Sequence, residues 1–345
     1  MGLSRRMRKG GAVEEATMEE AVRATLQAQL LDRRQKLGSA MEESGEASQL
    51  VHLLTEVDAA LERLDSGSYG ICRVCHDPIE ERLLLADPLV QTCLDHLSQA
   101  ERRALERDLE LAHAIQLKLL PRRSLGFGGW EVCYHFAPAG AVSGDYCDVI
   151  TPESAEGAML VALGDVSGKG VAASMLMAHL NALVRTLAER REPLPKLVGQ
   201  VNRAFCESTL PAHYATLVCA MARPDGSLEL CNAGHVRPIL LRGGDASPLP
   251  PGGLPVGLFC SAEFAVQSLS LGPGDSLVLY TDGLTEARNA GGEEYGPERL
   301  ASLVASLPAQ TPQGLLAACL ADHADFRAGT PVADDLTLLV LMRLA

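Results

Sequence analysis

Aspartates recur at the ends of short apolar runs in this 345-residue chain, and no other feature constrains the fold as strongly. The four places are Ser143-Gly144-Asp145, Val161-Ala162-Leu163-Gly164-Asp165, Leu277-Val278-Leu279-Tyr280-Thr281-Asp282 and Ala333-Asp334-Asp335 with the following strand-like run. A lone aspartate beside glycine is an ordinary turn. Acids at several strand ends, however, can meet on one rim of a sheet, where buried like charges are costly without cations. Such oxygen ligands select Mg²⁺ or Mn²⁺, and a pair of these ions can activate water against a phosphoryl group.

The chain from residue 122 to 345 is predicted to be one α/β domain. Strand-like runs rich in Val and Leu are Trp130–Phe136, Ala158–Leu163, Ala215–Ala222, Ser276–Tyr280 and Leu336–Met342. Helix-like runs are Val171–Leu187, Leu194–Thr209, Pro297–Leu307 and Pro312–His323. Turn signals such as Pro224-Asp225-Gly226 favour partly antiparallel pairing of the strands.

The N-terminal third has helical periodicity. Residues 1–16 are predicted to be a flexible start, and residues 17–97 to hold a helical hairpin because apolar residues recur at helical spacing on either side of Gly38-Ser39. A capping box, Ser98-x-x-Glu101, opens a linking helix over 98–121 that Pro121 ends. Its seam consists of Leu105, Leu109, Ala112, Gln116 and Leu119. Such a seam packs either on its own domain or on another chain, and the second alternative predicts a homodimer.

Four residues have the spacing of a zinc site: Cys72-x2-Cys75, then Cys93-x2-His96. Each pair can turn back through a knuckle, and two knuckles supply four tetrahedral ligands to one structural zinc ion. The alternatives are accidental spacing and haem attachment, because Cys72 to His76 also spells Cys-x-x-Cys-His. The seven other cysteines are scattered singly among apolar runs and are expected to be buried thiols.

Composition excludes several classes of function. A 47% hydrophobic content excludes wholesale disorder, and a net charge of −14 with only 4% aromatic residues argues against a nucleic-acid-binding surface. No run approaches the roughly 18–20 apolar residues of a membrane span, and the basic start lacks the apolar stretch of a secretory signal. We therefore expect a cytoplasmic protein whose partners are proteins or small molecules and whose clustered cysteines bind metal.

Residues 17–97 resemble the zinc-finger proteins of the DksA/TraR family. The resemblance rests on Glu62-Arg63-Leu64, Gly67-Ser68-Tyr69-Gly70-Ile71-Cys72-Arg73-Val74-Cys75, Ile79, Arg82-Leu83-Leu84, Ala86, Pro88 and Cys93. It implies a helical hairpin joined to a zinc finger, as in proteins that act on bacterial RNA polymerase. Here His96 stands where the family commonly has cysteine, and the tip carries Glu42, Glu43 and Glu46 instead of paired aspartates. These departures favour a sensing or docking module over a polymerase-channel protein.

Residues 105–344 resemble the PPM-type metal-dependent protein phosphatases, and the bacterial branch typified by SpoIIE and RsbU more closely. The motifs, in order, are Gly144-Asp145-Tyr146, Gly164-Asp165-Val166-Ser167-Gly168-Lys169-Gly170, Asn232-Ala233-Gly234-His235, Tyr280-Thr281-Asp282-Gly283-Leu284-Thr285-Glu286-Ala287 and Asp334-Asp335-Leu336-Thr337. The stretch from Leu109 to Pro121 resembles the leading helix of that branch. The resemblance implies a sandwich of two antiparallel sheets flanked by helices that hydrolyses phosphoserine or phosphothreonine on proteins.

The same resemblance implies roles for individual residues. Asp165 would bridge two Mn²⁺ or Mg²⁺ ions, with the Val166 carbonyl as a further ligand. Asp282 and Asp334 would complete one ion's shell, and Asp145 would bind near the pair, directly or through water. Lys169 could steer phosphate, and Asp335 would act beside the ligands. Asn232 and His235 are interpreted mainly as a turn held by side-chain hydrogen bonds. Ser167 stands where the eukaryotic branch has a histidine. Cys147 would be open to oxidation if it were exposed.

The sequence therefore predicts a cytoplasmic Mn²⁺- or Mg²⁺-dependent serine/threonine phosphatase with a zinc-containing regulatory module. Kinship implies a phosphorylated anti-anti-sigma protein as substrate. The alternative is a polymerase-binding or signalling scaffold with an inert phosphatase fold, which would be expected to have lost metal-site acids, and none is missing. A haem-binding sensor is a more distant alternative.

Overall fold

The computed structural model describes residues 20–43, 47–96, 99–154, 157–210, 213–307, 311–330, 332 and 334–344. The predicted flexible start, residues 1–16, lies outside them. The chain forms two compact units, Met1–Arg107 and Asp108–Ala345.

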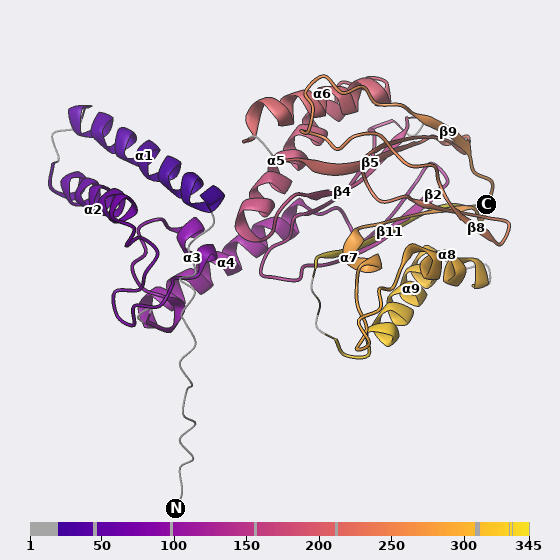
Figure 1. Ribbon diagram of the computed structural model, residues 1–345. Helices are drawn as coiled ribbons and strands as arrows, with labels where there is room; N and C mark the ends of the chain where they lie inside the picture. The colour runs from indigo at the N-terminus through magenta and orange to yellow at the C-terminus, as the bar shows by residue number, and fades with distance from the viewer. Residues whose placement is uncertain are drawn as a thin grey trace, which may run out of the picture. The chain divides into compact units, whose positions relative to one another are not determined.

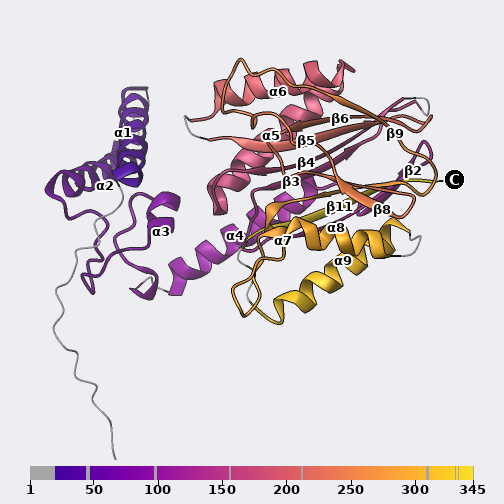
Figure 2. The ribbon, with the colours of Figure 1, turned by 45° about the vertical axis from the view of Figure 1, so that its right-hand side comes forward.

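The N-terminal unit is helical. Its elements are α1 (Glu20–Glu43), α2 (Ala47–Ser66), α3 (Glu81–Ala86), the short 3₁₀ helix η1 (Leu94–His96) and the first turns of α4 (Gln99–Leu119). Helices α1 and α2 lie side by side (Figures 1 and 2). Leu26 and Leu30 of α1 are buried in one cluster with Val57 and Ala60 of α2. The same cluster contains Cys72 and Cys93, so this small core includes part of the cysteine group.

The C-terminal unit contains two antiparallel sheets. The six-stranded sheet has the order β1-β2-β11-β10-β7-β8, with β1 (Ser124–Phe127), β2 (Trp130–Ala137), β7 (Ile239–Arg242), β8 (Asp245–Pro248), β10 (Ser276–Tyr280) and β11 (Leu336–Arg343). The five-stranded sheet has the order β3-β4-β5-β6-β9, with β3 (Asp145–Ile150), β4 (Met159–Val166), β5 (Ala215–Ala222), β6 (Ser227–Ala233) and β9 (Gln267–Ser270).

Helices cover the outer face of each sheet (Figure 1). They are α5 (Gly170–Ala188) and α6 (Leu194–Ser208) on one side, and α8 (Pro297–Ser306) and α9 (Pro312–Arg327) on the other; α7 (Asp282–Thr285) is a single turn after β10. Because strand side chains alternate, Val161 and Leu163 of β4 belong to the core that also includes β11 residues, whereas Leu160 and Ala162 pack with α5 and α6. The predicted sandwich of two antiparallel sheets with flanking helices is confirmed.

Helix α5 is, among the described residues, the one helix long and apolar enough to span a membrane by length and composition. Its buried residues Met177, Leu180 and Val184 pack in the cluster beside the five-stranded sheet. The helix therefore uses its apolar face in the core of this unit.

One pair of the scattered cysteines differs from expectation. Cys206 of α6 and Cys260 form a disulfide rather than two free buried thiols. The side chain of Asn202 explains how the two come together, because it accepts a hydrogen bond from Gly257 N (2.8 Å) and donates to Phe259 O (2.9 Å). These bonds hold the loop that carries Cys260 against α6.

Candidate active site

Asp145 and Asp165 lie opposite each other in the pairing of β3 with β4. Asp145 is only 1% exposed. Its Oδ2 accepts hydrogen bonds from the hydroxyls of Thr281 (2.9 Å) and Thr337 (2.6 Å). Thr281 follows β10 and Thr337 lies in β11, and both strands belong to the six-stranded sheet. The carboxylate of Asp145, from the five-stranded sheet, is therefore held by residues of the other sheet.

Asp282 and Asp334 come from neighbouring strands of the six-stranded sheet. Asp282 begins α7 directly after β10, and Asp334 precedes β11. The pairing of these strands continues beyond β10, because Thr281 N donates to Thr337 O (3.0 Å). A Cβ atom on Gly283 would overlap the carbonyl oxygen of Asp335, so glycine permits this close approach.

Asp335 organises the loop that leads into β3. Its two carboxylate oxygens accept hydrogen bonds from Ala139 N (2.7 Å) and Gly144 N (2.9 Å). Asp335 thus ties the start of β11 to the residues just before Asp145. This arrangement suits a residue that positions its neighbours.

Burial and neighbouring negative charges raise the pKa of three of these carboxylates. Burial, followed by the charges of Asp282, Asp334 and Asp335, raises the pKa of Asp165 to about 7. Burial and then the charge of Asp334 also raise the pKa of Asp282. The pKa of Asp145 lies well above its ordinary value, mainly because of burial. Negative charge is therefore unfavourable here unless a cation is present.

Lys169 supplies positive charge at the rim of this cluster. Its Nζ donates to Asp334 Oδ2 at 2.9 Å, and the two side chains are 67% and 40% exposed. This hydrogen bond raises the pKa of Lys169. The predicted phosphate-steering lysine thus contacts a predicted metal ligand.

The donor set at the carboxylates fits Mn²⁺ or Mg²⁺, since it consists of hard oxygen atoms without thiolate or imidazole. Val166, whose carbonyl is a predicted ligand, lies buried at the end of β4. In the described parts of the chain, a second group, of cysteines and a histidine, brings its ligand atoms within 4.8 Å of one another.

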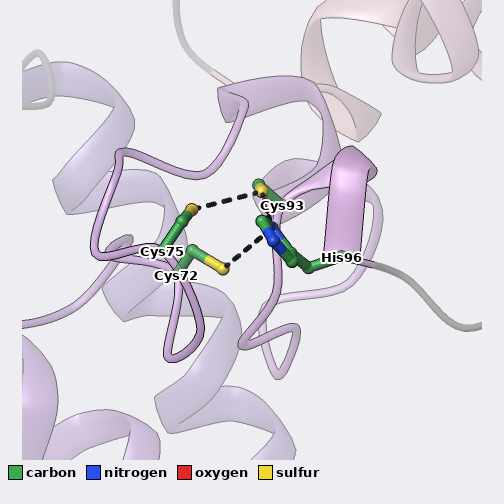
Figure 3. Close-up of side chains that lie close together, drawn as sticks. All are labelled: Cys72, Cys75, Cys93 and His96. Carbon is green, nitrogen blue, oxygen red and sulfur yellow. Dashed lines mark hydrogen bonds between the residues drawn. The ribbon is translucent and has the colours of Figure 1, made fainter.

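Cys72, Cys75, Cys93 and His96 converge on one point (Figure 3). Cys75 Sγ lies 3.7 Å from Cys93 Sγ, and His96 Nδ1 lies 3.1 Å from Cys93 Sγ and 4.0 Å from Cys72 Sγ. Sulfurs around a tetrahedral zinc ion with bonds of about 2.3 Å would be about 3.8 Å apart. The first pair also forms the expected knuckle, because Val74 N donates to Cys72 Sγ (3.5 Å). The residues present therefore fit zinc.

Comparison with known proteins identifies the family of the C-terminal unit. The family model described as Stage II sporulation protein E (SpoIIE) matches residues 155–344, which is more than half of the chain. The chain belongs to the SpoIIE family. Two relatives are Protein IcfG of Synechocystis sp., 28% identical over 267 residues (68% of this chain, 41% of that protein), and the phosphoserine phosphatase RsbU of Bacillus subtilis, 24% identical over 248 residues (70% and 72%). The chain thus matches about two fifths of the length of IcfG.

The solved SiaA-PP2C domain of Pseudomonas aeruginosa has the same fold as this SpoIIE-family unit. The superposition has a TM-score of 0.62 at 22% identity and covers 71% of this chain and 98% of that domain. The two-sheet sandwich described above is therefore a PP2C-type phosphatase fold.

His235 of this SpoIIE-family unit is structural in its contacts. It is 6% exposed, its Nδ1 lies 2.8 Å from the Thr216 hydroxyl, and its Nε2 lies 3.0 Å from Tyr280 O. Asn232 closes the predicted turn by accepting from His235 N (2.8 Å) and donating to His235 O (3.1 Å). Because Thr216 is in β5 and Tyr280 in β10, His235 joins the two sheets.

Two further predicted positions have defined surroundings. The Ser167 hydroxyl accepts a hydrogen bond from Tyr214 N (3.1 Å) and so helps to hold the loop after β4. Cys147 is 1% exposed, and burial raises its pKa well above the ordinary value. The condition for oxidation of Cys147, exposure, is not met.

Sequence reasoning missed the residues that support the acids. Thr281 and Thr337 stand inside motifs that were recognised for their aspartates, so a hydroxyl beside each aspartate motif was the available signal. The sequence gives no sign of the supporting roles of Ser143 and Gln116, since Gln116 stands in it only as the polar member of a helical seam. Both are buried.

Proposed function

We propose that the C-terminal unit hydrolyses phosphoserine or phosphothreonine on a protein, with two Mn²⁺ or Mg²⁺ ions held by Asp145, Asp165, Asp282, Asp334 and the Val166 carbonyl. The observation that carries this proposal is the carboxylate cluster, in which burial and like charges raise the pKa of Asp165 to about 7. Divalent ions would remove that penalty. Membership of the SpoIIE family and similarity to a phosphoserine phosphatase support the same activity.

When bound, the ions supply an activated water nucleophile and neutralise phosphoryl charge. The chain's own residues position this chemistry. The hydroxyls of Thr281 and Thr337 hold Asp145, and Asp335 holds the loop before it. Lys169, beside Asp334, adds positive charge that would attract a phosphorylated side chain. Ser167 offers no strong acid, so solvent water would protonate the leaving serine or threonine oxygen.

Removing single carboxylates tests the activity. Full-length protein with Mn²⁺ should hydrolyse an aryl phosphate and a phosphoserine peptide, and Asp165→Asn and Asp282→Asn should abolish both reactions. Asp245→Asn is the matched control, because Asp245 is exposed at the start of β8. Undiminished turnover in both site variants would refute the assignment and favour a scaffold with an inert phosphatase fold.

We propose that the substrate is a phosphorylated anti-anti-sigma type regulator. The support is similarity to RsbU, together with the absence of a strongly basic composition that would suit nucleic acid. The phosphoserine form of such a regulator should be hydrolysed with a kcat/KM at least tenfold above that of a peptide with the same phosphorylated sequence. Equal values would point to another substrate.

We propose that Cys72, Cys75, Cys93 and His96 hold one structural zinc ion in a DksA/TraR-like regulatory module. The sulfur and nitrogen distances support this proposal. Elemental analysis of the purified chain should give one zinc per chain, falling to near zero in Cys75→Ser. A Soret band would instead support the haem alternative, and capture of RNA polymerase by the full chain would support the polymerase-binding one.

We also propose that the protein is cytoplasmic and dimerises through α4. The seam residues cannot all serve that contact, because Gln116 and Leu119 pack within their own unit. The face available to a second chain carries Leu111 (61% exposed) and Ile115 (55% exposed). Light scattering should give a dimer for the wild type and a monomer for Leu111→Glu; a wild-type monomer would refute this contact.

A further inference from the structure

The side-chain amide of Gln116 in α4 forms two hydrogen bonds with the main chain of Ser143. The Gln116 side chain is 3% exposed and Ser143 is fully buried. Gln116 Nε2 donates to Ser143 O at 2.7 Å, and Gln116 Oε1 accepts from Ser143 N at 3.0 Å. One side-chain amide thus satisfies both main-chain polar groups of one residue, which a glutamine can do because it carries a donor and an acceptor.

The residue that Gln116 holds is in direct contact with Asp145. Ser143 Oγ accepts a hydrogen bond from Asp145 N at 3.0 Å. The adjacent Gly144 N is held by Asp335 Oδ2 (2.9 Å). The loop before β3 is therefore fixed from two sides, by α4 through Gln116 and by the start of β11 through Asp335.

A second contact strengthens the hold of α4 on this loop. His113, one helical turn before Gln116, places Nδ1 2.8 Å from Ala141 O. The carbonyl can only accept, so His113 donates this bond. Two side chains on one face of α4 thus bind two main-chain positions within the five residues that end at Asp145.

We propose that Gln116 is a positioning residue of the phosphatase site, which fixes Ser143 so that the Asp145 carboxylate is presented to the divalent ions. This inference rests on the proposed function, because it assigns Gln116 to the same metal site. Without the amide, Ser143 N and O would be buried and unpaired, and the loop would shift to recover hydrogen bonds. This shift would move Asp145 and disturb the hydrogen bonds that its carboxylate accepts from the hydroxyls of Thr281 and Thr337.

Direct measurement of Mn²⁺ binding tests the proposal without relying on turnover. Calorimetric titration of full-length, zinc-loaded protein with MnCl₂ should show at least tenfold weaker binding in Gln116→Met, which keeps the side chain's length but has no amide. Gln116→Glu keeps an acceptor for Ser143 N but turns a carboxylate oxygen towards Ser143 O with no proton to donate, so it should weaken Mn²⁺ binding at least as much as Gln116→Met does. Lys118→Met is the matched control, because Lys118 is exposed on the same helix, and it should bind Mn²⁺ as the wild type does.

A coupled variant separates positioning from general stability. Ser143→Ala removes the acceptor for Asp145 N but leaves the main-chain bonds to Gln116, so it should also weaken Mn²⁺ binding. The two effects should be less than additive in the double variant, since both act through one loop. Fluorescence melting should meanwhile show a folded C-terminal unit in each variant.

Each remaining outcome decides the matter. Wild-type Mn²⁺ affinity in a folded Gln116→Met variant would refute the inference alone. If Gln116→Met does not fold, Gln116→Glu decides by the same measurement, and failure of both to fold would overturn a positioning role in favour of a purely structural one. A wild-type chain that binds no Mn²⁺ would refute the proposed function together with the inference.

Discussion

The buried His235 gives a quantitative test of how the two sheets are joined. Tyr280 O can only accept, so Nε2 carries the proton, and Nδ1 accepts from the Thr216 hydroxyl. Burial lowers the pKa of His235 from 6.5 to about 4. Because the folded-state pKa is below the unfolded-state value, protons favour the unfolded chain, and stability is lost as the pH falls from about 6.5 towards 4. Between pH 7 and pH 5 this residue should cost about 2 kcal/mol of unfolding free energy.

Replacing the histidine should remove that pH dependence. His235→Leu leaves Tyr280 O and the Thr216 hydroxyl without their partner, so at pH 7 it should destabilise the unit by about 2–4 kcal/mol. From pH 7 to pH 5, however, the variant should lose about 2 kcal/mol less stability than the wild type.

Urea denaturation followed by tryptophan fluorescence measures this effect in the full chain. Trp130 is the single tryptophan and is buried in β2, so its emission reports on the C-terminal unit. Thr216→Val is the matched control, because it removes a hydroxyl but leaves the imidazole buried and should keep the wild-type pH dependence. If His235→Leu loses as much stability as the wild type between pH 7 and pH 5, the assigned contribution of His235 is wrong.

Three further predictions concern other contacts. Arg185→Ala leaves the Asp148 carboxylate, which is 0% exposed, without its bidentate, half-exposed partner. Urea denaturation should show a loss of about 3 kcal/mol, and a change below about 1 kcal/mol would contradict a role of Arg185 in neutralising the buried carboxylate. Gly283→Ala places a methyl group onto the Asp335 carbonyl oxygen. It should cost about 1–3 kcal/mol by the same assay and weaken Mn²⁺ binding, whereas Gly199→Ala, at a helical position with open space around it, should leave Mn²⁺ binding unchanged. Chelation of zinc should reduce helical circular dichroism without shifting the Trp130 transition; loss of both together would show that the units do not unfold independently.

The sequence predicted the long apolar strands well and the short or partly polar strands poorly. All five strand-like runs are strands, because each is a buried apolar segment rich in Val and Leu. Six of the described strands were not predicted. Four of them, β1, β7, β8 and β9, have four residues each, too few for a hydrophobic period to stand out. The apolar residues of β6 are interrupted by Ser227, Glu229 and Asn232. Strand β3 was missed for a different reason. It carries Asp148 in a buried position, and Arg185, 37 residues later, is what makes that burial tolerable.

The sequence names the acids of the candidate site but not the residues that hold these acids in place. Asp145, Asp165 and Asp282 lie beside glycines and Asp334 stands in an Asp-Asp pair before a strand, so all four could be named from their motifs in the sequence. No local pattern indicates that Gln116 binds Ser143, because the two are 27 residues apart and the geometry depends on where α4 ends. Helical periodicity places Gln116 on the seam of α4, and in the structure this side chain contacts Ser143 in the loop before β3.

The two candidate metal sites show why local and non-local sites differ in how well a sequence predicts them. The cysteine and histidine ligands come from one segment, residues 72–96, so their spacing alone constrains the geometry. The carboxylates come from strand ends as distant as Asp145 and Asp334, and three of them lie beside glycine in turn dipeptides that are common in any protein. Only the order of several motifs indicates that these acids belong together. The hydrogen bonds that position these acids come from Thr281, Thr337 and Gln116. These three residues form no sequence motif of their own, so their role can be recognised only in the folded structure, where the distant segments lie together.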